Sequence, residues 1–433
     1  MAKVSSNKAN SRTIVVASLI GTTIEFYDFY VYGTAAALVL GSLFFPAGAP
    51  GAQSLAAFLT FGIAFLARPF GAFLFGHFGD RVGRKSTLVT SMLLMGLSTT
   101  LIGVLPGYAL AGPVAPVLLC LLRLGQGIGL GGEWGGAALL AVENAPPGRQ
   151  AWFGMFPQLG PSIGFLLSNG LFFVLSASLG KGDFLAWGWR IPFLASGILV
   201  AIGLYVRGKI GETPAFARLA ARGGQVRTPL RELLRHHAAP LLLGSLSMVV
   251  CYALFYVSTV FALDYGTRVQ HVPRETFLAM LCGAIFAMAA MTPISAVLAD
   301  RFGRRPLLLA ASALAVISGS TVPLLLGTSD PSRVLLFLVL QLALMGLVFA
   351  PMGAFLPELF PSHVRYSGAS AAYSLGGLLG GSLAPYAAQQ LLTHGGLPWV
   401  GYYISGAALV SFAALLLVRS PARNDALANA PAA

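Results

Sequence analysis

The sequence predicts an all-α integral membrane protein with twelve transmembrane helices in two six-helix bundles related by pseudo-two-fold symmetry. Of its 433 residues, 56% are hydrophobic and only 9% are charged, whereas a soluble globular protein has about 25% charged residues. Its apolar stretches are about 20 residues or longer, as a bilayer-spanning helix requires. A charged loop also occurs twice, 220 residues apart, as Asp80–Lys85 (DRVGRK) and Asp300–Arg305 (DRFGRR). Such an internal repeat is typical of secondary transporters.

The expected spans follow one another along the chain. They cover approximately residues 14–40, 54–75, 86–106, 111–141, 151–178, 190–206, 239–263, 277–299, 307–326, 332–354, 368–392 and 398–418. The predicted division is therefore a cytoplasmic tail at 1–13, a six-helix bundle at 14–206, a cytoplasmic linker at 207–238, a second bundle at 239–418 and a disordered cytoplasmic tail at 419–433. No cleavable signal peptide is evident, so we expect the first span to act as its own insertion signal.

The basic residues indicate the orientation. With the N-terminus inside, 20 of the 27 Lys and Arg residues fall on the cytoplasmic side, in agreement with the positive-inside rule. This asymmetry explains most of the net charge of +13. It argues against nucleic-acid binding, which the same positive charge would suggest in a soluble protein.

Several classes of site are not predicted. Cys120, Cys251 and Cys282 lie inside spans without paired spacing or a neighbouring His, so we expect free thiols and neither a disulfide nor a metal site. No segment reads Gly-x-x-x-x-Gly-Lys-Ser/Thr, which argues against ATP-driven pumping. No nucleophile and base occur together on a loop. We therefore expect neither an enzyme nor a bound cofactor.

A second pair of loops supports the duplication. Glu143–Arg149 follows the fourth span and Glu358–Arg365 follows the tenth, at an offset of 215 or 216 residues. Both read Glu, then Pro three residues later, then Arg. Two matched pairs at nearly one offset favour a six-plus-six arrangement.

These loops resemble the major facilitator superfamily, whose diagnostic loop has the form Gly-x-x-x-Asp-Arg-x-Gly-Arg-Lys/Arg and is fully matched by Gly76–Lys85. Within that superfamily the chain resembles the metabolite:proton symporters, which carry shikimate, 2-oxoglutarate, citrate and proline or betaine, and it falls nearest the shikimate-like branch. The likeness is carried by Ile24–Phe29, Ala67–Gly71, Arg123–Gly136, Trp187–Phe193 and Glu212–Pro214. The resemblance implies proton-coupled uptake of a small organic acid by alternating access. It also implies a monomer among the lipids of a bacterial inner membrane, with protons and a small molecule as partners.

Away from the ends of the predicted spans, five charged residues occur: Glu25, Asp28, Arg68, Arg123 and Glu133. Each costs about 2.5–3.5 kcal/mol on insertion scales unless it is paired or hydrated. At a helical rise of about 1.5 Å per residue, Glu25 lies about 16 Å from the cytoplasmic end and Arg123 about 18 Å from the opposite end. Both are therefore expected near the midplane. The seventh and tenth spans are expected to hold no charge.

The first span combines acids with an aromatic side chain on one face. Glu25, Asp28 and Tyr32 follow i, i+3, i+7 spacing. Two carboxylates this close in a low dielectric cannot both ionise cheaply, so one should gain and lose a proton near neutral pH. Arg123 can bind a carboxylate in a bidentate manner.

We therefore expect an exchange of partners at Arg123. A proton taken up outside by Asp28 or Glu25 would free Arg123 for an anionic substrate, and release of the proton inside would return Arg123 to the acid. The alternative is a static ion pair that only holds the first and fourth spans together.

The other polar residues within spans are weaker candidates. Arg68 is expected to snorkel or to pair with the first or eleventh span near the cytoplasmic mouth. Glu133 is expected to organise a glycine-rich stretch that allows close helix packing. A stripe on the seventh span and several isolated amides serve either packing or substrate contact: Tyr252, Phe255, Tyr256, Thr259, Gln126, Gln158, Asn169 and Gln341.

The duplicated loops are expected to form an inner gate. Asp80 would accept hydrogen bonds from the eleventh-span backbone and from Arg84, and Asp300 with its loop would do the same for the eighth and fifth spans. Gly83 would permit the tight turn. The alternative is that basic inner loops set topology alone. The full set of gating and structural candidates is Asp80, Arg81, Gly83, Arg84, Lys85, Glu133, Glu143, Arg149, Asp300, Arg301, Gly303, Arg304, Arg305, Glu358 and Arg365.

Three other functions stay open at this stage. A proton/drug antiporter on the same fold would need an acidic cavity, whereas Arg68 and Arg123 balance the acids here. A betaine or proline symporter would also suit a cavity with arginines and aromatic side chains. A transporter-like solute sensor would usually add a cytoplasmic output domain. The pattern favours a small carboxylate without specifying which one.

Overall fold

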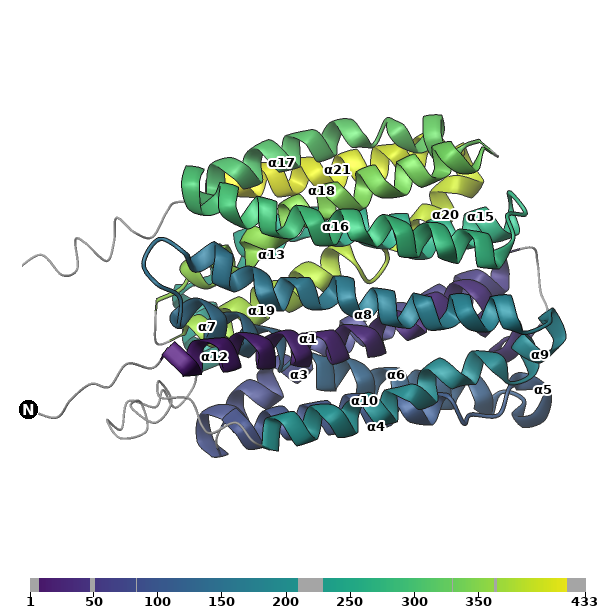
Figure 1. Cartoon of the computed structure of the whole chain (residues 1–433), viewed down its shortest axis with the longest axis horizontal. Coiled ribbons are helices and arrows are strands. Elements are labelled where there is room, and N and C mark those ends of the chain that lie inside the picture. Colours follow the sequence, from purple (N-terminus) through teal and green to yellow (C-terminus); the bar gives the residue numbers. More distant parts are fainter. Residues whose placement is uncertain are drawn as a thin grey trace, which may run out of the picture.

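The computed structural model describes residues 8–46, 51–82, 84–208, 229–328, 330–361 and 364–418. Within these ranges every regular element is a helix, and the long helices run side by side (Figure 1). The elements of the first half are α1 (Lys8–Ala35), η1 (Ala36–Leu40), α2 (Gly41–Phe44), α3 (Ala52–Val82), α4 (Arg84–Ile102), α5 (Tyr108–Ala111), α6 (Val114–Leu130), α7 (Trp134–Glu143), α8 (Gln150–Ser178), α9 (Lys181–Ala186), η2 (Gly188–Arg190) and α10 (Ile191–Gly208).

The second half repeats this pattern of long helices. Its elements are α12 (Pro229–His236), α13 (Ala238–Ser247), α14 (Val249–Tyr256), η3 (Val257–Phe261), α15 (Ala262–Arg268), α16 (Arg274–Phe302), α17 (Arg304–Ser318), η4 (Val322–Leu326), α18 (Pro331–Glu358), α19 (Arg365–Gly380), α20 (Ala384–Gly395) and α21 (Leu397–Leu417).

Eight helical stretches of the described chain are long and apolar enough to cross a membrane. They are Ala52–Phe75, Val114–Glu143, Gln150–Ser178, Gly188–Tyr205, Ala238–Arg268, Arg274–Phe302, Pro331–Glu358 and Leu397–Leu417. The other four predicted spans also fall on helix, in α1, in α4, in α17 with η4, and in α19 with α20. Glu25 and Asp28 lower the mean hydropathy of α1, and α17 and α19 are short because the α-helix is interrupted after each. The count of twelve stays a prediction.

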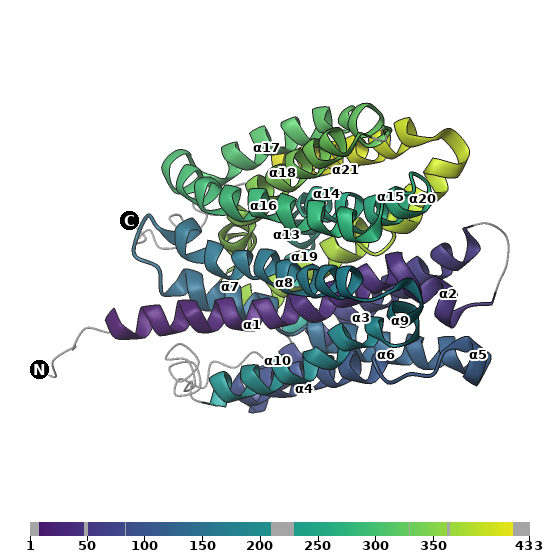
Figure 2. The same cartoon turned by 45° about the vertical axis from the view of Figure 1, so that its right-hand side comes forward.

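Two zones of helix packing join the first and second halves of the chain. α8 packs against α16 and α18, and α3 and α7 pack against α19. In Figures 1 and 2, α16, α17, α18 and α21 form the upper part of the molecule, and α1, α4, α6 and α10 form the lower part. We call the end with the loop between α16 and α17 the inner end, following the predicted orientation. The opposite end, with α15 and the start of α3, is the outer end.

The glycine-rich fourth span packs closely, as expected, although its helix is interrupted. α6 ends at Leu130 and α7 begins at Trp134. A Cβ atom on Gly127 would overlap the carbonyl oxygen of Ala64, and one on Gly71 would overlap that of Ile128. The backbones of α3 and α6 therefore approach so closely that only glycine fits between them.

The duplication extends to an unusual local geometry. η1 and η3 are both five-residue π-helical segments, and their first residues, Ala36 and Val257, are 221 residues apart. This offset is close to that of the duplicated loops. The two segments also pack against each other. Because π-helical turns are rare and frequent at functional sites, this pair indicates that the outer parts of the first and seventh spans are related by the pseudo-symmetry.

Candidate functional site

The centre of the molecule is filled by aromatic side chains from three helices. Phe29 in α1 packs on Phe65 in α3 with ring centroids 5.0 Å apart. Tyr256 in α14 packs on Phe61 with a separation of 5.2 Å. All four side chains are buried. They form an apolar layer where the two halves meet.

A small cavity lies beside this layer. A cavity of about 10 Å³ is lined by Tyr30, Asn169, Tyr256 and Thr259, among others. A cavity of this size holds about one water molecule, whereas sites for small organic molecules measure about 300–1,000 Å³. This cavity is therefore too small for an organic substrate, which could occupy it only if the side chains around it move.

An ion pair lies beside the aromatic layer. The Nη2 atom of Arg68 in α3 is 3.5 Å from Oε1 of Glu25 in α1, and both side chains are almost fully excluded from solvent, at 1% and 0% exposure. The guanidinium carbon lies 5.1 Å from the ring centre of Tyr373 in α19 and 5.7 Å from that of Phe29. Arg68 therefore meets the first and eleventh spans, as expected, but in the buried core of the bundle and not at its mouth.

The guanidinium group of Arg68 retains hydrogen-bonding capacity. Its Nε and Nη2 atoms form no well-aligned hydrogen bond, although Nη2 makes the ion pair with Glu25 and the Tyr373 hydroxyl lies nearby. Buried donors without partners are costly, so this group would bind an anion that reaches it. Among the described residues that the sequence predicted to bind substrate, Arg68 has the largest number of donor atoms without a well-aligned hydrogen bond.

Arg123 has different partners from those predicted. It donates hydrogen bonds to the Gln126 side chain and, at 3.0 Å, to the carbonyl oxygen of Phe61, and its guanidinium lies 3.7 Å from the ring centre of Tyr32. It makes no ion pair with any described residue. The predicted pairing of Arg123 with the acids of the first span is therefore wrong for this conformation, because Gln126 and Tyr32 occupy its surroundings.

Asp28 also points away from Glu25. Its Oδ1 atom accepts a hydrogen bond of 2.5 Å from Ser196 in α10, while its Oδ2 atom has no partner. The Gln126 amide donates to the Asp28 carbonyl oxygen at 2.8 Å and to the Thr99 hydroxyl at 2.9 Å. Residues at i and i+3 point in directions about 60° apart around a helix. Glu25 can therefore face α3 while Asp28 faces α10.

The amides predicted for substrate contact fall into two groups. Gln158 accepts a hydrogen bond from Trp134 and donates one to the carbonyl oxygen of Phe349, at 3.0 and 2.9 Å, so it bridges α7, α8 and α18. Asn169 accepts from Thr34 at 2.9 Å and lines the central cavity. The structure does not bring Gln341 to this site, because its side chain bonds with α17 and with Thr321 next to η4.

The stripe of the seventh span lies at the centre, as its spacing suggested. Tyr252, Phe255, Tyr256 and Thr259 are all buried. Tyr252 donates to the Tyr373 carbonyl oxygen at 3.3 Å, and Phe255 stacks on Tyr30 at 4.9 Å. The stripe therefore contacts both α1 and α19.

At the inner end, the second duplicated loop joins the two halves. The carboxylate of Asp300 accepts hydrogen bonds of 2.9 Å from the backbone N–H groups of Ala151 and Trp152, at the start of α8. This is the predicted contact between the eighth and fifth spans, and it places negative charge at a helix N-terminus, where charge is favoured. Gly303 has φ +94°, a conformation that glycine adopts without strain.

Arg304 forms the other part of this inner contact. It pairs with Glu358 and donates to the Gln150 side chain at 3.2 Å. Burial lowers the pKa of Arg304 from its usual value, which the neighbouring carboxylate of Asp300 counteracts. An arginine remains charged despite such a shift, so the loop keeps a permanent cation between the halves.

The remaining gating candidates have varied surroundings. Arg305 donates to the carbonyl oxygens of Leu415 and Leu416, and Arg365 to that of Phe360. Glu133 is buried between α6 and α7, whereas three candidates are exposed, namely Glu143, Arg149 and Arg301. The side chains of Asp80, Arg81, Arg84 and Lys85, and all of Gly83, lie outside the described residues.

Sequence reasoning missed several polar residues of the core. Ser196, Thr99 and Tyr373 carry no sequence signal of their own, and only the packing of helices brings them to the acids and to Arg68. Asp264 was missed for another reason: the seventh span was ended at residue 263, whereas the helix continues to Arg268 and buries Asp264. The expectation that this span holds no charge is therefore wrong. The i, i+4 spacing of Asp264 and Arg268 was the available signal.

Comparison with known proteins covers nearly the whole chain. The profile of the family described as Sugar (and other) transporter matches residues 13–239, and that described as Major Facilitator Superfamily matches residues 270–432. The Inner membrane metabolite transport protein YhjE of Escherichia coli (strain K12) is 51% identical over 94% of each chain. The Shikimate transporter of the same organism is 38% identical over 96% of each chain. The Proline/betaine transporter of that organism is 30% identical over 98% of this chain and 86% of its own.

Solved structures show the same fold. A structure of the proton:xylose symporter XylE bound to 6-bromo-6-deoxy-D-glucose has a TM-score of 0.79 and 16% sequence identity, covering 96% of this chain and 97% of that one. A partially occluded, inward-open structure of XylE from E. coli has a TM-score of 0.74 and 18% identity, covering 95% and 99%. At these identities the likeness concerns the fold alone.

Proposed function

The chain belongs to the major facilitator superfamily, so it is a multi-pass inner membrane transporter and not an enzyme, and we propose that it takes up a small organic acid together with a proton. The observation that carries this proposal is the buried guanidinium of Arg68. Two of its nitrogen atoms form no well-aligned hydrogen bond, and its ion pair with Glu25 spans 3.5 Å. A substrate carboxylate would supply the bonds that this group lacks.

The aromatic layer suits the rest of such a substrate. Phe29, Phe65 and Tyr373 surround the guanidinium of Arg68 with ring centres within 5.8 Å. Rings in this arrangement bury apolar carbon atoms next to a charged group. The relative with 38% identity is named a shikimate transporter, which supports a carboxylate with a carbon ring among the first compounds to test.

Proton coupling follows from competition for Arg68. Ionised Glu25 and a substrate carboxylate would compete for the same guanidinium. A proton on Glu25 ends that competition, so the proton and the anion bind together from outside. When the proton leaves to the cytoplasm, Glu25 regains Arg68 and displaces the substrate. This scheme keeps the exchange of partners predicted from sequence but moves it from Arg123 to Arg68.

Asp28 has another role in this scheme. Its side chain bonds Ser196 in α10 and makes no ion pair with any described residue. It therefore joins α1 to α10 within the first half. Arg123 holds α6 to α1 and α3 through Tyr32 and the carbonyl oxygen of Phe61.

A zwitterion is the second candidate substrate. Arg68 and Glu25 present opposite charges side by side, next to aromatic rings that can attract a quaternary ammonium group. The Proline/betaine transporter of E. coli is 30% identical to this chain. A zwitterion would place its carboxylate on Arg68 and its cationic group near Glu25.

Uptake into proteoliposomes tests the proposal. With an acidic exterior and an alkaline interior, we expect accumulation of one member of a panel of shikimate, 2-oxoglutarate, citrate, betaine and proline. An uncoupler that collapses the pH gradient should abolish accumulation above equilibrium. Uphill accumulation that is unaffected by the uncoupler would exclude proton symport. Uptake of betaine or proline alone would select the zwitterion.

A further inference from the structure

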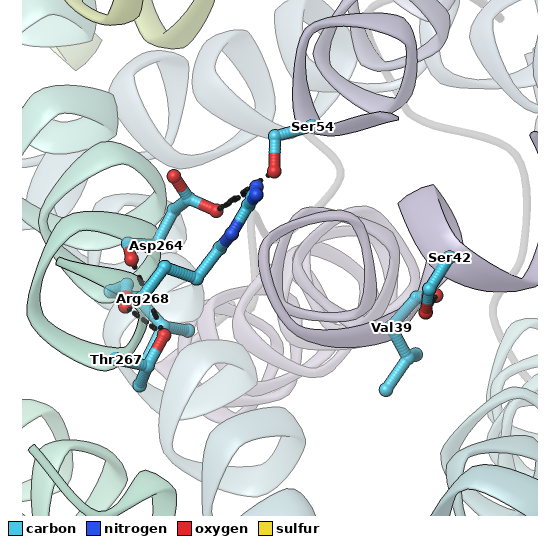
Figure 3. Close-up of polar contacts among 7 residues, drawn as sticks. Val39, Ser42, Ser54, Asp264, Thr267 and Arg268 are labelled. Atoms are coloured by element: carbon cyan, nitrogen blue, oxygen red, sulfur yellow. Dashed lines mark hydrogen bonds and ion pairs between the residues drawn. The ribbon is translucent and has the colours of Figure 1, made fainter. Parts of the chain in front are cut away.

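We propose that Asp264 closes the outer end of the transport path by bonding the two halves of the chain to each other. The carboxylate in α15 accepts a hydrogen bond of 3.0 Å from Ser54, near the start of α3, and its Oδ1 atom lies 3.4 Å from Nη1 of Arg268 (Figure 3). We call these three residues the outer latch. Nothing in the comparisons assigns a role to them.

Asp264 is buried at its contact with the first half of the chain. Its side chain is 2% exposed, whereas that of Arg268 is 43% exposed. A carboxylate excluded from water is stable only while hydrogen bonds and opposite charge replace its hydration. Ser54 supplies one of these bonds from the other half of the chain, so separating the halves would remove it.

The position of the latch fits a movable element. α15 has seven residues and is separated from α14 by the π-helical segment η3. η1, at the matching position of the first span, packs against both η3 and α15. π-Helical segments inside α-helices are frequent at functional sites and are among the known causes of helix kinks. In the proposed opening, α15 tilts at η3 while α14 keeps its aromatic side chains in the central layer.

The latch lies apart from the proposed substrate site. Eight residues separate Asp264 from Tyr256, which corresponds to about 12 Å along a helix. The latch would thus control access from outside without contacting the substrate. This inference rests on the proposed transport function in one respect, since it assumes a transport path that opens to the outside.

Cysteine labelling tests the latch without any substrate. The three native cysteines are replaced (C120A, C251A, C282A), and Thr259→Cys, at the wall of the central cavity, serves as the reporter. Intact cells are treated with a membrane-impermeant maleimide. We expect Ser54→Ala to raise the labelling rate about tenfold, which is the effect of losing one hydrogen bond to a charged group. Asp264→Asn keeps an oxygen atom that can accept from Ser54 but loses the charge and the ion pair with Arg268, so it should raise the rate by a smaller factor of about three.

The double variant and a matched control sharpen the test. If Ser54 and Asp264 act through one bond, adding Asp264→Asn to Ser54→Ala should change the labelling rate little from that of Ser54→Ala alone. Asp330→Asn is the control, because it removes an ion pair with Arg333 that is exposed and lies within one half. It should leave labelling unchanged. If the Asp264→Asn variant does not reach the membrane, the labelling of Ser54→Ala alone decides whether the proposal holds.

Unchanged labelling in Ser54→Ala and Asp264→Asn, at normal protein abundance, would overturn the latch. The two tests are independent. Unchanged labelling would not affect the interpretation of the uptake assay, and a failure of uptake would not affect the interpretation of the labelling. Faster labelling from inverted vesicles alone would also overturn the proposal, because it would place the opening at the inner end.

Discussion

Arg68 and Glu25 form an ion pair at the centre of the molecule, and the side chains of both residues are almost fully buried. Removing one partner of such a pair leaves an uncompensated buried charge and costs about 3–5 kcal/mol. The pair can therefore separate at low cost only if another group takes the place of one partner. A proton on Glu25 and an anion on Arg68 are the two replacements that the proposed symport supplies together.

Glu25→Gln should uncouple transport. Glutamine has the shape of a protonated glutamate but binds no proton, so it cannot compete with substrate for Arg68. We expect loss of uphill accumulation, with exchange of substrate across the membrane retained. In the parent protein the KM should rise with external pH, because ionised Glu25 competes with the substrate. In Glu25→Gln the KM should not change with pH.

Asp28→Asn is the matched control for this prediction. Asparagine retains an oxygen atom that can accept the hydrogen bond from Ser196, so uphill accumulation should persist. The opposite pattern, with accumulation lost in Asp28→Asn and kept in Glu25→Gln, would assign proton coupling to Asp28.

Arg68→Lys should weaken substrate binding while keeping the charge. Lysine cannot form the two parallel hydrogen bonds that a guanidinium offers to a carboxylate. Loss of such bonds corresponds to about 1.5–3 kcal/mol, or roughly a 10- to 150-fold fall in kcat/KM for uptake. The control is Arg333→Lys at an exposed position, which should behave as the parent. If Arg123→Lys loses uptake and Arg68→Lys keeps it, the substrate binds Arg123, as the sequence first suggested.

The sequence was sufficient to predict the fold and five of the six buried charged residues in the described part of the chain, all but Asp264. Composition, the duplicated loops and the buried charges predicted a helical membrane bundle of the superfamily to which the chain belongs. The pairing of the charges could not be predicted in the same way. Whether Glu25 meets Arg68 or Arg123 depends on the rotation and depth of three helices, which hydropathy does not specify.

Asp264 illustrates a second limit of the sequence. A charged residue at the edge of an apolar run is normally taken as the end of a span. Here its desolvation is offset by Ser54, which lies 210 residues away in the sequence. Only the folded arrangement could indicate that this aspartate is buried.

Asp300→Asn should loosen the inner end. The carboxylate accepts two backbone hydrogen bonds at the N-terminus of α8, and loss of its charge there costs about 1 kcal/mol. The inward-open population should therefore rise by roughly fivefold. Ser370→Cys is a suitable reporter, because Ser370 is buried and packs close to Gly135 of α7. Its labelling in inverted vesicles measures the change.

Arg301→Gln is the control for the inner end. Arg301 lies next to Asp300 but is exposed, and its guanidinium lies over the ring of its neighbour Phe302. Its substitution should not alter labelling. Equal labelling rates in Asp300→Asn and the parent would mean that the duplicated loop sets topology and does not stabilise the closed inner end.

Gly127→Ala should destabilise the protein and disturb the site. The added methyl group would overlap the Ala64 carbonyl and push α6 away from α3, at a cost of about 1–3 kcal/mol. Arg123 lies one turn earlier on α6 and bonds the Phe61 carbonyl on the same neighbouring helix, so uptake should fall as well. Thermal unfolding in detergent, followed by intrinsic fluorescence, should show a lower midpoint temperature.

Gly170→Ala separates this packing effect from the general effect of adding a methyl group to a helix. Gly170 lies inside α8, and a Cβ atom there would meet nothing within 4 Å. Since alanine favours a helix over glycine by up to about 1 kcal/mol, this variant should unfold at the same or a higher temperature. The two substitutions are chemically identical, so opposite signs would localise the effect to the α3–α6 contact. A Gly127→Ala variant as stable as Gly170→Ala would mean that the two helices can move apart freely, and that Arg123 does not depend on their close approach.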